Sequence, residues 1–245
     1  MTPEFLNLDQ VDTDGALRET AGEAIATLEE SGDTRADFLR KAGLAGGAVA
    51  GGGLLLGALV PGAARAAGRP PKTFGKGDIG ILNFALTLEY LEADFYNEAT
   101  RNNNRKSFIT DPQIGQLLKR VTTDENVHVK LISGALGSAA VKRPRFDFRG
   151  TTSGQDIFIK TTYELENTGV HAYLGQAVNL RSKFFLMAAS TIATVEGRHA
   201  SVAGMLFQKT SGSISPDGPF DVPFSGPRVL KAVRRTNFPT TGFGK

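Results

Sequence analysis

Apolar residues recur at intervals of three and four positions over four long stretches of the chain. In the first stretch, Ile81, Phe84, Leu88, Leu91 and Phe95 follow this spacing, which places them on one face of an α-helix. The pattern predicts four helices, over residues 77–102, 111–137, 153–180 and 182–209. Helices of about 25 residues are roughly 37 Å long. Four of them predict an all-α four-helix bundle.

Residues at the helix ends and the lengths of the connections agree with this bundle. Asp111 is a suitable N-cap for the second helix, which Pro112 opens, and Ser153 is the expected N-cap of the third. Only a few residues join the third and fourth helices, so these two must be antiparallel neighbours. The fifteen residues 138–152 can extend over roughly 50 Å. They predict one long crossover between the second and third helices.

The segments outside the bundle have a different composition. Residues 1–33 are acidic and polar, and we expect them to be disordered. Residues 34–68 combine a basic start, an apolar run over 42–60 and an Ala-Arg-Ala sequence at 64–66, which is the layout of a secretory signal. The apolar run is also nearly long enough to span a membrane, so a cleaved signal and a retained anchor both remain open. Residues 210–245, rich in Gly, Pro and Ser, predict a mostly irregular basic tail with a short helix over 228–235.

The basic start of the signal-like segment resembles a twin-arginine export signal. Thr34, Arg35, Phe38 and Leu39 match that pattern, but Ala36 stands where the second arginine belongs. The sequence therefore predicts export, to the periplasm, the cell wall or the exterior, without establishing the export route.

Composition and charge narrow the kinds of site that the chain can hold. It has no cysteine, which excludes disulfides, thiolate metal sites and cysteine nucleophiles. The formal charge is +3, but residues 1–66 hold 5 Lys and Arg against 10 Asp and Glu, and residues 67–245 hold 23 against 15. A basic body favours anionic surfaces such as lipid or wall polymer, although a solvated basic surface is the simpler interpretation. No basic motif interleaved with aromatic residues is present, so we expect no nucleic-acid partner.

Two helices carry a glutamate and a histidine three positions apart among apolar neighbours. These pairs are Glu125 with His128 and Glu196 with His199. Positions i and i+3 share a helix face, and two buried polar groups need a partner such as a metal ion. With 12 Glu and 3 His in 245 residues, chance predicts about 0.15 such pairs. Two pairs therefore indicate a shared purpose.

The first and third helices also resemble one another. In each, a Leu-Glu pair is followed by a tyrosine seven residues after the glutamate, giving Glu89 with Tyr96 and Glu166 with Tyr173. Each of these helices precedes a helix that carries a Glu-x-x-His pair. The bundle is thus predicted to be a duplicated helix pair.

The stretches "LNFALTLEYLEADFY", "ENTGVHAYLGQA" and "VEGRHAS" resemble the ferritin-like superfamily, and most of all its exported bacterial branch sometimes labelled desiccation-related. The resemblance implies a carboxylate-bridged centre for two divalent ions, with iron first and manganese as the alternative. Glu125 and Glu196 would bridge the ions, while Glu89 and Glu166 would be terminal ligands. His128 and His199 would each bind one ion.

Several neighbouring residues leave alternatives open. Glu92 is a rival of Glu89 as a ligand or an addition to it, and Glu164 is a weaker rival of Glu166. Asp124 either orients a ligating histidine or is solvated. Tyr96 and Tyr173 either bond to ligand carboxylates or belong to the core.

His171 is read as a neighbour of the site or a surface residue, not as a ligand. The resemblance implies an oxidoreductase that reacts with O2 or peroxide, as a ferroxidase, peroxidase or catalase. The alternative is a non-enzymatic metal-binding or structural protein of the envelope that protects against stress. The segment 42–60 or the basic surface would mediate contact with membrane or wall, and the sequence does not indicate an oligomeric state.

Overall fold

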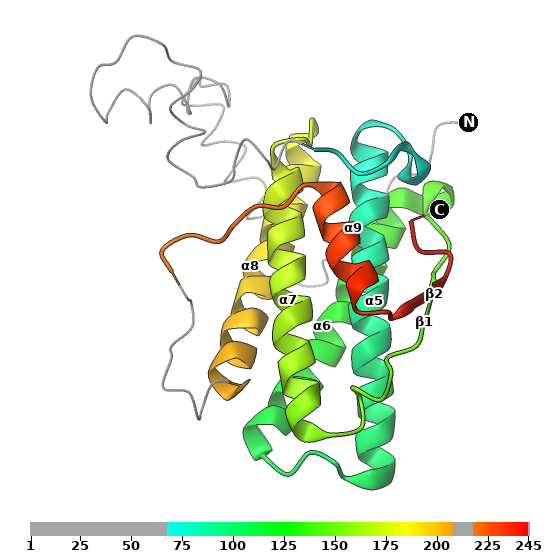
Figure 1. Cartoon of the computed structure of the whole chain (residues 1–245). Coiled ribbons are helices and arrows are strands. Elements are labelled where there is room, and N and C mark those ends of the chain that lie inside the picture. Colours follow the sequence, from blue (N-terminus) through cyan, green and yellow to red (C-terminus); the bar gives the residue numbers. More distant parts are fainter. Residues whose placement is uncertain (1–67, 208–217, 245) are drawn as a thin grey trace.

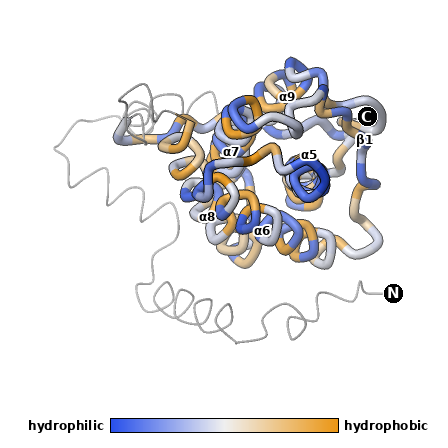
Figure 2. The backbone as a smooth tube through the Cα atoms, turned by 90° about the horizontal axis from the view of Figure 1, so that it is seen from below, coloured by the Kyte–Doolittle hydropathy of each residue, from blue (hydrophilic) through white to orange (hydrophobic). Residues whose placement is uncertain are grey.

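The computed structural model describes residues 68–207 and 218–244 of the chain. Four long helices form its body, namely α5 (Gly77–Lys106), α6 (Pro112–Leu136), α7 (Gln155–Ala177) and α8 (Lys183–Phe207). They lie side by side (Figure 1), and an end view shows them around a common centre (Figure 2). The predicted all-α four-helix bundle is confirmed. The predicted regions 1–33 and 34–68, except Gly68, lie outside the described residues. So do residues 208 and 209 of the predicted fourth helix and residues 210–217 and 245 of the predicted tail.

The helix ends follow the predicted residues at one cap and depart from them at another. Asp111 is the N-cap of α6, where its side chain accepts a hydrogen bond of 2.8 Å from the backbone N–H of Gln113. The prediction that Ser153 is the N-cap of α7 is wrong, because Gly154 takes that place and no side chain caps this helix. The Ser153 hydroxyl instead accepts a hydrogen bond of 3.3 Å from the side chain of Asn102 on α5.

The connections give the predicted topology. α5 packs mainly against α6 and α7 mainly against α8, and the crossover between α6 and α7 runs along the outside of the bundle (Figure 1). It contains the short 3-10 helix η3 (Gly137–Ala139) and the strand β1 (Arg145–Phe146). β1 pairs antiparallel with β2 (Pro239–Thr241), and Arg145 lies opposite Thr241. The end of the chain therefore returns to the crossover.

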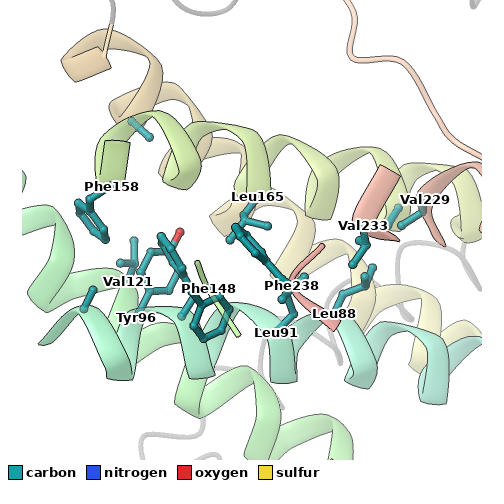
Figure 3. Close-up of a cluster of buried hydrophobic side chains, with 14 of the residues drawn as sticks. Leu88, Leu91, Tyr96, Val121, Phe148, Phe158, Leu165, Val229, Val233 and Phe238 are labelled. Atoms are coloured by element: carbon teal, nitrogen blue, oxygen red, sulfur yellow. The ribbon is translucent and has the colours of Figure 1, made fainter. Parts of the chain in front are cut away.

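The segment after residue 217 contributes to the core. Its helix α9 (Gly226–Arg235) begins two residues before the helix predicted over 228–235. Val229, Leu230 and Val233 are buried in the same cluster as Leu88 and Leu91 of α5 (Figure 3). Together with β2, α9 makes this region more ordered than its Gly, Pro and Ser content indicated. Because α9 is amphipathic, a composition count hides its apolar face.

The core differs between the two ends of the bundle. One end is aromatic, and the rings of Phe95 and Phe158 stack there with centroids 5.6 Å apart. The other end holds the aliphatic side chains of Leu86, Ile132 and Ile192 and the ring pair of Phe74 and Phe84. None of the described helices combines the length and apolar character of a membrane span.

Candidate metal centre

The six predicted metal ligands meet in the middle of the bundle, between the two ends of the core. All six are buried, and the four glutamates have no exposed surface. They come from all four helices: Glu89 from α5, Glu125 and His128 from α6, Glu166 from α7, and Glu196 and His199 from α8. Four fully buried carboxylates in an apolar bundle are costly unless positive charge neutralises them.

These side chains form two overlapping groups that suit metal ions. The first group consists of Glu89, Glu125, His128 and Glu196, and the second of Glu125, Glu166, Glu196 and His199. Within each group, one nitrogen or oxygen atom per residue lies within 4.8 Å of the others. Glu125 and Glu196 belong to both groups, which is the position of a carboxylate that bridges two ions.

The two histidines occupy equivalent places. His128 Nδ1 lies 3.1 Å from Glu125, 3.3 Å from Glu89 and 3.2 Å from Glu196. His199 Nδ1 lies 3.3 Å from Glu125 and 3.2 Å from Glu166. Each imidazole therefore faces one terminal glutamate and at least one shared glutamate.

Many of the inward-facing atoms have no hydrogen-bond partner. They are Oε2 of Glu89 and Glu166, Oε1 of Glu125, both carboxylate oxygens of Glu196 and Nδ1 of His199. Although His199 Nδ1 is close to two carboxylates, no hydrogen bond is aligned between them. Buried polar atoms without partners are rare in native proteins. These residues consequently fit a pair of metal ions, which would complete the bonding of the convergent atoms.

Two tyrosines hold the terminal glutamates from the opposite repeat. The Tyr96 hydroxyl donates a hydrogen bond to Oε1 of Glu166, and the Tyr173 hydroxyl donates one to Oε1 of Glu89. Both tyrosines are buried. Since each hydroxyl occupies Oε1, it leaves Oε2 of the same carboxylate directed at the centre.

A model of the ferritin-like domain matches residues 77–209, which is more than half of the chain. The chain belongs to the ferritin-like domain family. No curated protein matches it.

One histidine of this ferritin-like domain has an additional carboxylate partner. Asp124 Oδ2 lies 3.0 Å from Nε2 of His199, on the ring edge that faces away from the glutamates. Arg120, one helical turn earlier, holds the same oxygen at 2.7 Å. A carboxylate behind a ligating imidazole fixes its orientation and increases its basicity. The contact with His199 supports the interpretation that Asp124 orients this histidine, rather than the solvated alternative. In the sequence, the spacing of four residues between Arg120 and Asp124 could have revealed their ion pair.

A fifth buried glutamate lies beside the six predicted ligands of the ferritin-like domain. Glu92 is 3% exposed, and it belongs to neither group of convergent atoms. It lies near Gly169 of α7, where an added Cβ would be 3.2 Å from Glu92 and 3.1 Å from Glu196. Gly169 therefore makes room for both carboxylates. The sequence analysis did not identify Gly169, although alignment of the two repeats makes it the equivalent of Glu92.

The charges of the centre shift the pKa values of its members. Burial raises the pKa of Glu92 well above its ordinary range, and the charges of Glu196 and Glu125 raise it further. Burial also raises the pKa of Glu125 from 4.5 to about 7. Burial lowers the pKa of His199, but the close carboxylates of Glu125 and Glu166 outweigh this effect and raise it from 6.5 to about 11. Without metal, protons thus supply the positive charge that the carboxylates require.

The remaining predicted neighbours lie apart from the centre. Glu164 is exposed and pairs with Lys160 at 3.9 Å, so it is no rival of Glu166. His171 stacks on Phe224 with centroids 4.2 Å apart and belongs to neither group of convergent atoms.

An open groove connects one side of the centre to solvent. It has a volume of about 750 Å³ and lies between α6 and α8. Arg120, Asp124, Arg198 and His199 are among the described residues that line it. The groove therefore brings solvent close to the His199 side of the ferritin-like domain.

Proposed function

We propose that this ferritin-like protein binds two iron or manganese ions and reacts with O2 or hydrogen peroxide. The observation that carries the proposal is the convergence of six buried side chains whose inward atoms lack partners. Four carboxylates balance the charge of two divalent ions, and oxygen and imidazole ligands suit iron and manganese. Glu125 and Glu196 would bridge the ions, with Glu89 and His128 on one and Glu166 and His199 on the other.

The surrounding side chains would position and protect this centre. When bound, two redox-active ions supply electrons to O2 or peroxide, each ion giving one. Tyr96 and Tyr173 hold the terminal carboxylates in place, and Asp124 holds the ring of His199. Burial and the neighbouring glutamates raise the pKa of Glu92 well above its ordinary range in the metal-free protein, so this carboxyl would be a proton donor beside the centre.

The test uses the full chain, loaded with iron or manganese, reduced without oxygen and then mixed with O2 or hydrogen peroxide. Metal content and the absorption change on oxidation are recorded. With an added chemical reductant that returns the oxidised ions to the reduced state, we expect repeated turnover in the native protein and its loss in Glu125→Ala. Bound metal without turnover would support the non-enzymatic, protective envelope protein instead, and the absence of bound metal would contradict both.

Export is part of the same proposal. The layout of residues 34–68 supports an exported protein of the desiccation-related type, in the periplasm, wall or exterior, with O2 or peroxide as its small-molecule partner. Mass spectrometry of the protein from fractionated cells tests this. An N-terminus after residue 66 in the envelope fraction is expected for a cleaved signal, and an intact chain in the cytoplasmic fraction would contradict export.

A further inference from the structure

An apolar cavity of about 50 Å³ lies at the end of the bundle where α7 and α8 are joined. All four helices contribute to its wall, with Leu88, Ile132, Tyr173 and Ile192 on the side nearest the candidate metal centre. Leu88 directly precedes Glu89, and Ile132 and Ile192 each lie four residues from a predicted ligand on their own helices. The cavity therefore reaches to within one helical turn of the ligands.

The described wall offers no free polar side chain to hold water. The hydroxyl of Tyr173 is bonded to Glu89. The amide of Gln176 donates to the backbone of Gly68 at 3.2 Å and accepts from Asn179 at 3.1 Å. An ordered water needs two to four polar partners, so a wall without them favours a small apolar molecule over ordered water.

The size of the cavity limits what it can hold. An apolar cavity of roughly 150 Å³ accommodates a benzene ring, and this one has about a third of that volume. It therefore suits one small apolar molecule, such as a diatomic gas or a xenon atom.

We propose that this cavity binds one O2 molecule on the Glu89 side of the centre. The naming of O2 rests on the proposed function, whereas the binding of a small apolar molecule does not. The cavity and the groove between α6 and α8 give the centre two separate approaches. The cavity serves O2. The groove, where Arg120, Asp124 and Arg198 lie among apolar side chains, serves hydrogen peroxide.

Xenon is the probe for the binding site, because it is apolar, small and visible by X-ray diffraction. Metal-free crystals of the full chain are pressurised with xenon, and one peak is expected between Leu88 and Ile192. Ala189 lines the cavity, so Ala189→Leu should abolish the peak and Ala189→Val should weaken it. Ser190→Leu is the matched control, because Ser190 is the exposed neighbour on the same helix. The absence of a peak in the native protein, or an undiminished peak in a folded Ala189 variant, would overturn the proposal.

A second measurement asks whether the site serves O2. The reduced, metal-loaded chain is mixed with O2 or with hydrogen peroxide, with and without xenon. Ala189→Leu and xenon should each slow oxidation by O2 several-fold and leave oxidation by peroxide unchanged, whereas equal slowing of both would contradict an O2 site. A protein without metal would refute the proposed function, and the xenon peak would still decide whether the cavity binds apolar molecules. Conversely, oxidation without a xenon site would refute only the cavity proposal.

Discussion

The helix pair α5–α6 and the helix pair α7–α8 supply the same chemical groups in the same order. Each pair provides a terminal glutamate, a tyrosine seven residues later and a Glu-x-x-His pair. The tyrosines even exchange partners, since each one bonds to the glutamate of the other pair. The six predicted ligands are therefore nearly symmetric.

The surroundings of these ligands are not symmetric. Asp124, which bonds to His199, corresponds to Val195 in the other pair, and among the described residues no carboxylate pairs with Nε2 of His128. Glu92 corresponds to Gly169, whose missing side chain leaves room for the Glu92 carboxylate. The predicted ligands follow the internal repeat, whereas Asp124 and Glu92 break it, so the two candidate metal positions are unequal. The His199 position faces the groove between α6 and α8, and the Glu89 position faces the apolar cavity.

The largest effect should come from removing a carboxylate that both positions share. Glu125→Ala takes a ligand from each group, so bound metal should fall from two ions per chain to almost none. Glu89→Ala and Glu166→Ala each affect one group and should each leave about one ion, by the ligand assignment of the family. Elemental analysis of dialysed protein measures this, with Glu164→Ala as the control on an exposed carboxylate. Equal losses in all three ligand variants would contradict a bridging Glu125.

The stability of the metal-free protein should fall as pH rises, by a few kcal/mol in total. A carboxyl whose pKa is raised in the folded state stabilises that state below its ordinary pKa of 4.5 and loses this contribution as pH rises, for Glu125 through about 7. Glu92 and Glu196 act in the same direction. His199 does so between 6.5 and about 11, while the lowered pKa of Glu89 opposes the trend.

Glu92→Gln measures the contribution of the Glu92 carboxyl to this pH dependence. Glutamine resembles the protonated acid, so the metal-free variant should be more stable than the native protein at pH 8, and the difference should disappear at pH 4. Urea unfolding at several pH values measures it, and Glu164→Gln should leave the curve unchanged. A Glu92→Gln curve that runs parallel to the native one would show that Glu92 is not held in its protonated form.

The partner of His199 should matter at one metal position only. Asp124→Asn keeps the shape of the side chain but removes its charge, and such changes typically weaken metal binding by about 10–100-fold. Calorimetric titration with Mn²⁺ should show one weakened step and one unchanged step. Val195→Ala, at the corresponding place in the other pair, should change neither step. Equal weakening of both steps after Asp124→Asn would remove the basis for unequal positions.

The smallest effect concerns the space at Gly169. Alanine in a helix interior is favoured over glycine by about 0.5–1 kcal/mol, but its Cβ would crowd Glu92 and Glu196. Gly169→Ala should therefore destabilise the protein by about 1 kcal/mol. In a Glu92→Ala background the same change should become neutral or stabilising. The unfolding free energies of the native protein, the two single variants and the double variant measure the coupling between the two positions. Independent effects of the two changes would contradict the shared space.

Local spacing in the sequence was sufficient to find the bundle and the residues that converge. A helix has 3.6 residues per turn, so Glu196 and His199 must share a face, and the repeat identifies Glu89 and Glu166 in the same way. Cap residues were only partly predictable. Asp111 does cap α6, but Ser153 bonds across the molecule to Asn102 instead.

Features that depend on contacts between distant segments could not be predicted in this way. The bonds from each tyrosine to the opposite glutamate, the burial of Val229 and Leu230, and the apolar cavity all arise from packing. Spacing shows which residues share a helix face, but it does not show which space remains unfilled after four helices have packed. Gly169 has no distinctive local pattern as a helix glycine, and only alignment of the two repeats points to it.

The central claim is that two unequal metal positions share Glu125 and Glu196. Anomalous diffraction from crystals of the full chain soaked in Mn²⁺ tests it most directly. The account predicts two peaks per chain, both contacting Glu125 and Glu196, one beside His128 and one beside His199. The peak beside His199 should persist at lower Mn²⁺ concentration, because Asp124 supports that histidine. No peak among these six side chains at any Mn²⁺ concentration would contradict the metal centre itself.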